Sequence, residues 1–216
     1  FSVLHILWII WVREIIGQMV PGKERITLGS RKQFKANYLP SSDGFNCDEL
    51  KQYRRLSNRA AVKVLVLWLA IVALIGILWF RKLLTPKELL LLSAVFYVAD
   101  LFCVLYWCPF QRLIMKNRCC ITCRIFNWDS LMMFSPLMFI GGLYSLSLFI
   151  LSLIVFIIWE IRVFKYPERF WDGANETLRC GNCSDKICQS KRKAELSVKG
   201  ILETNHPTGF KKNHYQ

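Results

Sequence analysis

The sequence is poor in histidine and in acidic residues, and each shortage narrows the possible functions. His5, His206 and His214 are the three histidines, and they are too scattered to supply paired haem ligands inside a helical bundle. The motifs G-x-x-x-x-G-K-[ST], G-x-S-x-G and H-E-x-x-H are absent from the chain. These absences remove the commonest motif-based enzyme assignments. We therefore favour a role without catalysis and leave enzymatic activity open.

The chain also lacks a nucleic-acid-binding motif of the usual kinds, although it is strongly basic. It has 29 Lys and Arg against 15 Asp and Glu, a net charge of +14. Its 54% hydrophobic content lies above the usual range for soluble domains, and its mean hydropathy is +0.30. A basic chain of this kind suits loops held against anionic lipid headgroups. We expect a membrane protein with lipid partners and no nucleic-acid partner.

The apolar residues gather into long runs, which predict an all-α integral membrane protein with a bundle of about four transmembrane helices. The predicted spans are 64–80, 89–107, 125–140 and 143–163. Thr85 followed by Pro86 predicts the start of the second helix, because proline is favoured in the first helical turn. Asp100 is the single acid inside that second span.

The last two spans come from one hydrophobic stretch, Trp128–Phe164, that is too long to cross once. A continuous helix over it would be about 55 Å long, against a hydrocarbon core of about 30 Å. Gly141 and Gly142 lie within the stretch, and Pro136 lies before them. We therefore predict a hairpin of a short helix and a full span. The alternative is one long helix that is kinked and tilted.

The chain divides into three predicted regions. Residues 1–59 form an interfacial and basic surface segment with an amphipathic helix over 47–59. Residues 1–12 are apolar but too few to cross a bilayer, so they predict an interfacial helix or the end of a further span. Residues 60–164 form the transmembrane region, and residues 165–216 form a hydrophilic, basic, cysteine-bearing tail.

The distribution of basic residues distinguishes between the two topologies. The loop 110–127 has four cations and no acid, and the segment 13–59 and the tail are also basic. A hairpin puts all three on one side of the membrane, which the positive-inside rule makes the cytoplasm. The turn 81–88 does not follow the positive-inside rule in this topology, because its three cations then lie on the side opposite the cytoplasm. We expect the bacterial cytoplasmic membrane, with a cysteine-rich cytoplasmic face.

Six of the nine cysteines form two clusters, one before and one after the long hydrophobic stretch. A C-x-x-C pair lets two thiolates reach one ion, and two pairs supply the four ligands of a structural zinc site or an iron–sulfur cluster. The predicted metal ligands are Cys120, Cys123, Cys180 and Cys183, with Cys119 and Cys188 as alternates. They can meet only if both clusters lie on one face. Disulfides, and unpaired or palmitoylated thiols, are the alternatives.

The run Arg118–Asp129 (RCCITCRIFNWD) resembles a string in uncharacterised bacterial multi-pass membrane proteins. Those proteins are similar again around Tyr166–Trp171 (YPERFW) and at the second cysteine cluster. The resemblance covers roughly residues 105–190 and implies no known activity.

Our leading prediction is a non-catalytic subunit of a larger membrane complex, or of a homo-oligomer, whose cysteine clusters bind zinc or an iron–sulfur cluster at the membrane surface. The first alternative is a membrane thiol-disulfide oxidoreductase that uses one C-x-x-C pair. The second is a small transporter or channel that uses Asp100, because an acid inside a span is expensive and marks an ion or proton pathway or a helix contact.

Overall fold

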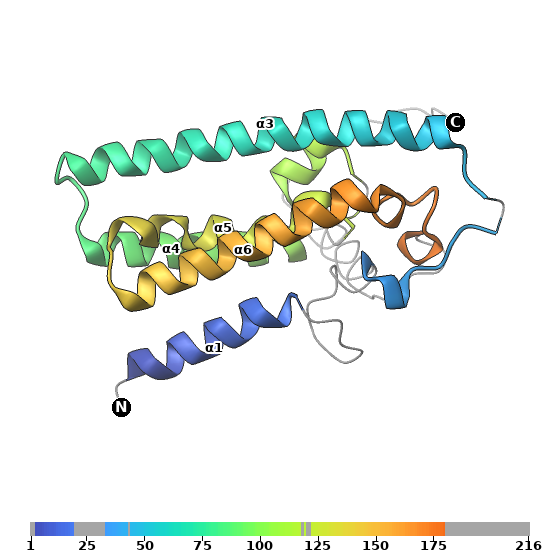
Figure 1. Cartoon of the computed structure of the whole chain (residues 1–216). Helices are drawn as coiled ribbons and strands as arrows, with labels where there is room; N and C mark the ends of the chain where they lie inside the picture. The colour runs from blue at the N-terminus through green and yellow to red at the C-terminus, as the bar shows by residue number, and fades with distance from the viewer. Residues whose placement is uncertain (1–2, 20–32, 43, 118, 120–121, 180–216) are drawn as a thin grey trace, which may run out of the picture. The chain divides into compact units, whose positions relative to one another are not determined.

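The computed structural model describes residues 3–19, 33–42, 44–117, 119 and 122–179 (Figure 1). These residues belong to one compact unit, and they form helices and turns but no strand. The α-helices are α1 (Val3–Gly17), α3 (Cys47–Phe80), α4 (Pro86–Leu105), α5 (Asp129–Phe134) and α6 (Leu143–Lys165). Short 3-10 or π turns are η1 (Lys35–Asn37), η2 (Phe110–Met115), η3 (Arg124–Trp128), η4 (Ser135–Phe139), η5 (Pro167–Phe170) and η6 (Glu176–Leu178).

Three of the described helices, α3, α4 and α6, are long and apolar enough to cross a membrane. These three helices support the integral membrane class that hydropathy predicts. The amphipathic helix predicted at 47–59 is the first part of α3, which continues without a break through the first span to Phe80. Asn46 caps this helix by accepting a hydrogen bond from the Asp48 backbone N–H at 2.9 Å.

The second span begins where the sequence predicts. Thr85 is the N-cap of α4 and forms a capping box with Glu88, while Pro86 occupies the first turn. The helix ends at Leu105, two residues before the predicted limit at Trp107. α3 and α4 run in opposite directions on either side of the turn that joins them (Figure 1).

The long hydrophobic stretch is broken at Gly141 and Gly142, as predicted. Both glycines have a positive φ, of 71° and 84°, which a residue with a Cβ rarely adopts. The chain reverses there, and α6 packs back against α5 and η4 (Figure 1). The predicted short helix at 125–140 is wrong in detail: these residues form η3, α5 and η4 in succession. Pro136 explains the last change, because it has no backbone N–H to donate within a helix.

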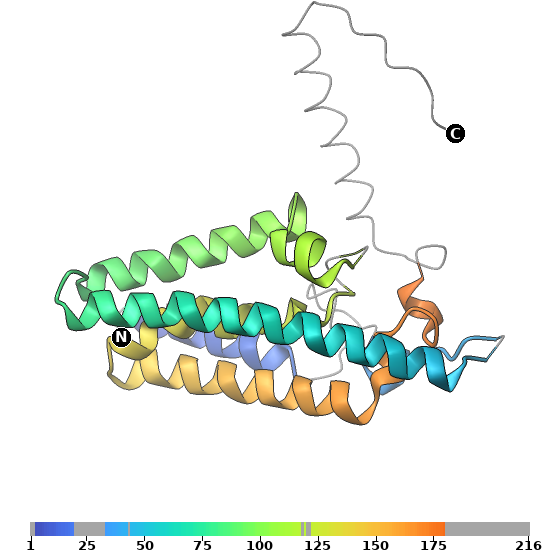
Figure 2. The same ribbon diagram turned by 90° about the horizontal axis from the view of Figure 1, so that it is seen from above.

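α1 lies alongside α6 and runs in the same direction (Figures 1 and 2). The Trp8 indole donates to Ser147 Oγ at 2.8 Å, and the His5 ring hydrogen-bonds the Tyr144 hydroxyl. Farther along, Ile15 is 1% exposed in the larger core cluster, which also contains Val155 and Trp159 of α6. α1 is therefore a packed member of the helical region.

The segment after α6 folds against the segment before α3. Ser41 N–H donates to the Ala174 carbonyl at 3.1 Å, and Glu176 N–H donates to the Leu39 carbonyl at 2.9 Å. Asn175 is fully buried, and its amide donates to the Arg169 carbonyl at 2.9 Å. We call residues 33–42 and 166–179 the cap. The sequence predicts only a hydrophilic tail here.

Candidate functional site

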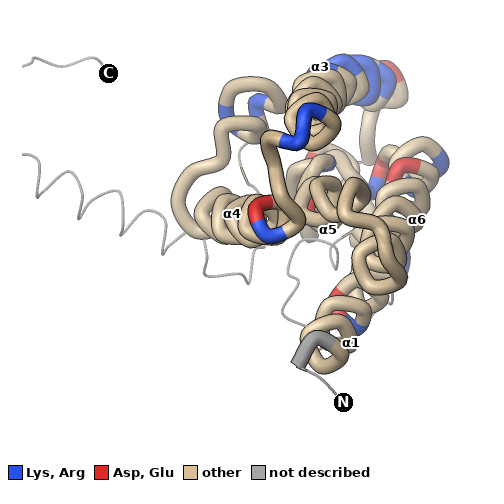
Figure 3. Tube along the Cα trace, turned by 90° about the vertical axis from the view of Figure 1, so that its left-hand side faces the viewer, with Lys and Arg blue, Asp and Glu red and all other residues tan. Residues whose placement is uncertain are grey.

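The cap, the first turns of α3 and the loop between α4 and α5 meet at one end of the molecule. The Tyr53 hydroxyl of α3 donates to the Phe170 carbonyl at 2.8 Å, and its ring stacks on Trp171. Arg124 of the loop forms an ion pair with Glu160 of α6 and a hydrogen bond with Asn58 of α3. The charged residues of α3 lie in its first half, up to Lys63, and the rest of the helix is apolar (Figure 3).

A small polar cavity of about 120 Å³ lies between the loop and the cap. Cys119 and Asn117 line it from the loop, and Asp172 and Arg179 line it from the cap. Arg179 is fixed in turn, because its guanidinium donates to Ser41 Oγ at 2.7 Å and to the Asp172 carbonyl at 3.2 Å. The loop that carries Cys119 and the cap residues up to Arg179 therefore approach each other on one side of the helices.

Cys123 has a different environment from Cys119, although it is four residues away. It is 1% exposed in an apolar cluster with Val64 and Trp128. Burial raises the pKa of the Cys123 thiol to about 12, because a thiolate there would be poorly solvated. Cys123 is a neutral, packed thiol in the absence of a metal ion.

The other predicted metal ligands, Cys120, Cys180, Cys183 and Cys188, lie outside the described residues. Within the part of the chain that is described, no group of three or more His, Cys, Asp or Glu side chains is placed to hold a metal ion. The structure thus brings Cys119 and Arg179 together and leaves the four-thiolate site as a prediction.

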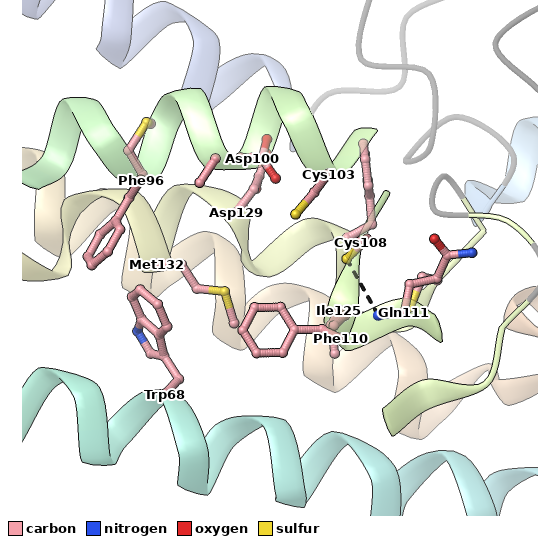
Figure 4. Close-up of a pocket in the computed structure, with 14 residues that line it drawn as sticks. Trp68, Phe96, Asp100, Cys103, Cys108, Phe110, Gln111, Ile125, Asp129 and Met132 are labelled. Atoms are coloured by element: carbon pink, nitrogen blue, oxygen red, sulfur yellow. Dashed lines mark hydrogen bonds between the residues drawn. The ribbon is translucent and has the colours of Figure 1, made fainter. Parts of the chain in front are cut away.

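A second group of polar residues lies between the membrane helices. Asp100 of α4 and Asp129 of α5 line one cavity of about 110 Å³, together with Trp68, Cys103 and Cys108 (Figure 4). Figure 4 shows the two aspartates beside each other at the junction of α4 and α5. Neither forms an ion pair with a described residue. Two unpaired carboxylates in this position are a candidate cation site.

Asp129 is held in place by a hydrogen-bond network that the sequence did not predict. The side-chain amide of Gln18, the residue after α1, donates to both Asp129 carboxylate oxygens, at 3.3 and 3.4 Å, and accepts from the Ser130 hydroxyl at 3.2 Å. The Ser130 backbone N–H donates to Asp129 at 2.7 Å. The available signal was a second acid at the start of a hydrophobic stretch, which by itself suggests only a helix end.

No protein-family model, curated protein or solved structure matches this chain. The resemblance of residues 105–190 to bacterial multi-pass proteins therefore stays a prediction.

Proposed function

We propose that this membrane protein is a non-catalytic subunit whose two cysteine clusters bind one metal centre between the loop and the cap. The observation that carries the proposal is the cavity shared by Cys119 and Arg179. Cys180 is the next residue after Arg179, so the second cluster begins about 3.8 Å of chain from the cavity wall. The four-thiolate site needs the two clusters on one face, and this arrangement supports that requirement.

The environments of the loop thiols suggest different roles for them. Cys119 faces the polar cavity, which favours it as a ligand over its predicted status as an alternate. Cys123 is buried and protonated, so it joins the site only if the charge of the metal ion displaces its proton. The same burial disfavours a redox cycle between Cys120 and Cys123, because the thiolate is the reactive form.

The metal centre would fix the cap to the helices. Zinc bound by thiolates from both segments would act as a staple, and the basic residues around it would face anionic headgroups or a partner subunit. An iron–sulfur cluster held by the same thiolates would transfer electrons within a larger complex. The excess of Lys and Arg at this end favours the cytoplasmic side of a bacterial cytoplasmic membrane.

Metal analysis of the purified full chain tests the proposal. We expect about one zinc ion or one iron–sulfur cluster per chain, measured by plasma mass spectrometry and absorption spectroscopy. The double variants Cys119→Ala/Cys120→Ala and Cys180→Ala/Cys183→Ala should each lose the metal, since a shared site needs both clusters. The control is Cys47→Ala, whose thiol is exposed at the start of α3. Wild-type protein without zinc or iron above background contradicts the proposal.

A further inference from the structure

The membrane region contains a groove between α1 and α4, with α5 and η4 at its base. α4 packs against α5 and η4, and α1 packs against α6, so the two outer helices leave a gap between them. Two adjoining cavities occupy this gap, of about 500 Å³ and about 200 Å³. Three residues, Trp11, Tyr97 and Met133, line both cavities and join them into one groove.

The larger cavity is almost entirely apolar. Leu7, Leu90, Phe134 and Leu148 are among the side chains that line it. Ser93 of α4 lines it as well, and the Ser93 hydroxyl is buried without a hydrogen-bond partner. A buried hydroxyl left unsatisfied costs free energy, so a ligand atom that accepts from it would bind favourably. This part of the groove suits the apolar body of a ligand.

The smaller cavity is lined by acidic side chains. Glu14 of α1 lines it together with Asp100 and Asp129, and none of the three carboxylates forms an ion pair with a described residue. Gln18 fixes the Asp129 carboxylate through its amide, as described above. Acids in a membrane region are commonly compensated by a cation. The described side chains supply none at this site.

The residues shared by the two cavities suit a cation better than a neutral group. Trp11 and Tyr97 pack edge to face with ring centroids 5.1 Å apart, at the point where the apolar cavity meets the acidic one. Aromatic faces attract organic cations through their ring quadrupole. A metal ion or a proton would need the carboxylates alone, whereas an apolar cavity of 500 Å³ also needs an apolar occupant.

We propose that this groove binds a lipophilic organic cation, with its apolar body between α1 and α4 and its charged centre at Glu14, Asp100 and Asp129. The ligand class is a monovalent ammonium or phosphonium ion with large apolar substituents. Neither cavity of the groove is lined by a residue of the cap, and Asp100 and Asp129 also line the neighbouring cavity that contains Cys123 of the loop. The ligand enters from the bilayer through the open side of the groove.

Tetraphenylphosphonium and its anionic isostere tetraphenylborate test the charge requirement. Binding to the purified full chain in detergent is measured by isothermal titration calorimetry and equilibrium dialysis. We expect saturable binding of tetraphenylphosphonium and no saturable binding of tetraphenylborate. Asp100→Asn and Asp129→Asn should each weaken binding roughly tenfold or more, because each removes a charge close to the ligand. Asp48→Asn, at the exposed start of α3, is the matched control and should bind as the wild type does.

A steric variant tests the apolar cavity independently of the acids. Ala94 lines the large cavity, so Ala94→Phe should fill it and abolish binding. Val98→Phe places the same ring on an exposed part of α4 outside both cavities and should leave binding unchanged. The proposal is overturned if the two tetraphenyl ions bind alike, if the wild type binds neither, or if all the groove variants bind normally. Where an aspartate variant fails to fold, the Ala94 and Val98 pair still decides the question.

Discussion

At the scale of single residues, Cys119 and Cys123 differ more than their spacing suggests. One lines a polar cavity beside the cap, and the other is packed against Val64 and Trp128. The sequence offers both residues as candidate metal ligands, because spacing carries no information about which way each side chain faces. Part of the apolar cluster that buries Cys123 comes from α3, more than forty residues earlier in the chain.

The raised pKa of Cys123 makes stability depend on alkaline pH. The folded thiol keeps its proton up to about pH 12, whereas an unfolded thiol loses it near about pH 8.5. Between these values unfolding releases a proton, so the free energy of unfolding falls as the pH rises, by at most about 1.4 kcal/mol per pH unit. We expect the melting temperature of metal-free wild type to fall more steeply between about pH 8.5 and 10.5 than that of Cys123→Ala. Equal slopes in thermal unfolding followed by circular dichroism would contradict this.

Asp129 is the residue for which sequence reasoning was least informative. It comes directly after Trp128, at the boundary of a basic loop, and such a position predicts a capping or solvated acid. The structure instead places Asp129 against Gln18, which directly follows α1. Asp100 was easier to single out from the sequence as a candidate site residue. It is an acid in the middle of an apolar run, and that pattern is visible without knowledge of its contacts.

At the scale of elements, the turn between η4 and α6 depends on glycine. Gly142 has φ 84° and ψ 160°, a conformation almost restricted to glycine, and no atom lies within 4 Å of where its Cβ would be. Gly142→Ala should therefore destabilise the protein through backbone strain alone, by about 1–3 kcal/mol. Denaturant titration in detergent measures the loss.

The neighbouring residue provides the control for this turn. Leu143 is 78% exposed and begins α6 in ordinary helical geometry. Leu143→Ala should change the free energy of unfolding by less than about 0.5 kcal/mol. If both variants unfold like the wild type, the turn does not need its left-handed backbone.

The position of α1 could not be predicted from its sequence. Its 15 residues are apolar on most sides, which fits an interfacial helix, a partial span or a buried helix equally well. The choice depends on contacts with Tyr144, Ser147 and Trp159, which lie more than 130 residues away. Hydropathy reports how apolar a segment is, but not which segment covers it.

At the scale of the whole molecule, the helical crossings place the loop that carries Cys119 and the cap, which is described up to Arg179, at one end. We expect an impermeant maleimide to label Cys47 and Cys183 from the same side of the membrane, each in a chain with its other cysteines replaced. Cys47 is exposed at the start of α3, and Leu83 lies beyond the other end of that helix. A cysteine introduced by Leu83→Cys should be labelled from the opposite side. Labelling of Cys47 and Cys183 from different sides of intact cells would contradict this.

Many of the helix boundaries could be predicted from the hydropathy pattern and from the positions of the glycines. The start of α4, the break at Gly141 and Gly142 and the start of α6 lie where the sequence places them. The cap was missed, because its order depends on a fully buried Asn175 and on backbone pairing with Leu39. Such long-range polar contacts leave no periodic pattern in the sequence.

α3 is longer than a bilayer requires. Its 34 residues span about 51 Å, against a hydrocarbon core of about 30 Å, and it contains no proline to bend it. About 20 Å of the helix therefore projects beyond the lipid, where Tyr53 holds the cap. Its far half carries Trp68, in the wall of the cavity that contains both aspartates. One continuous helix therefore joins the cap, through Tyr53, to the wall of the cavity between the membrane helices, through Trp68.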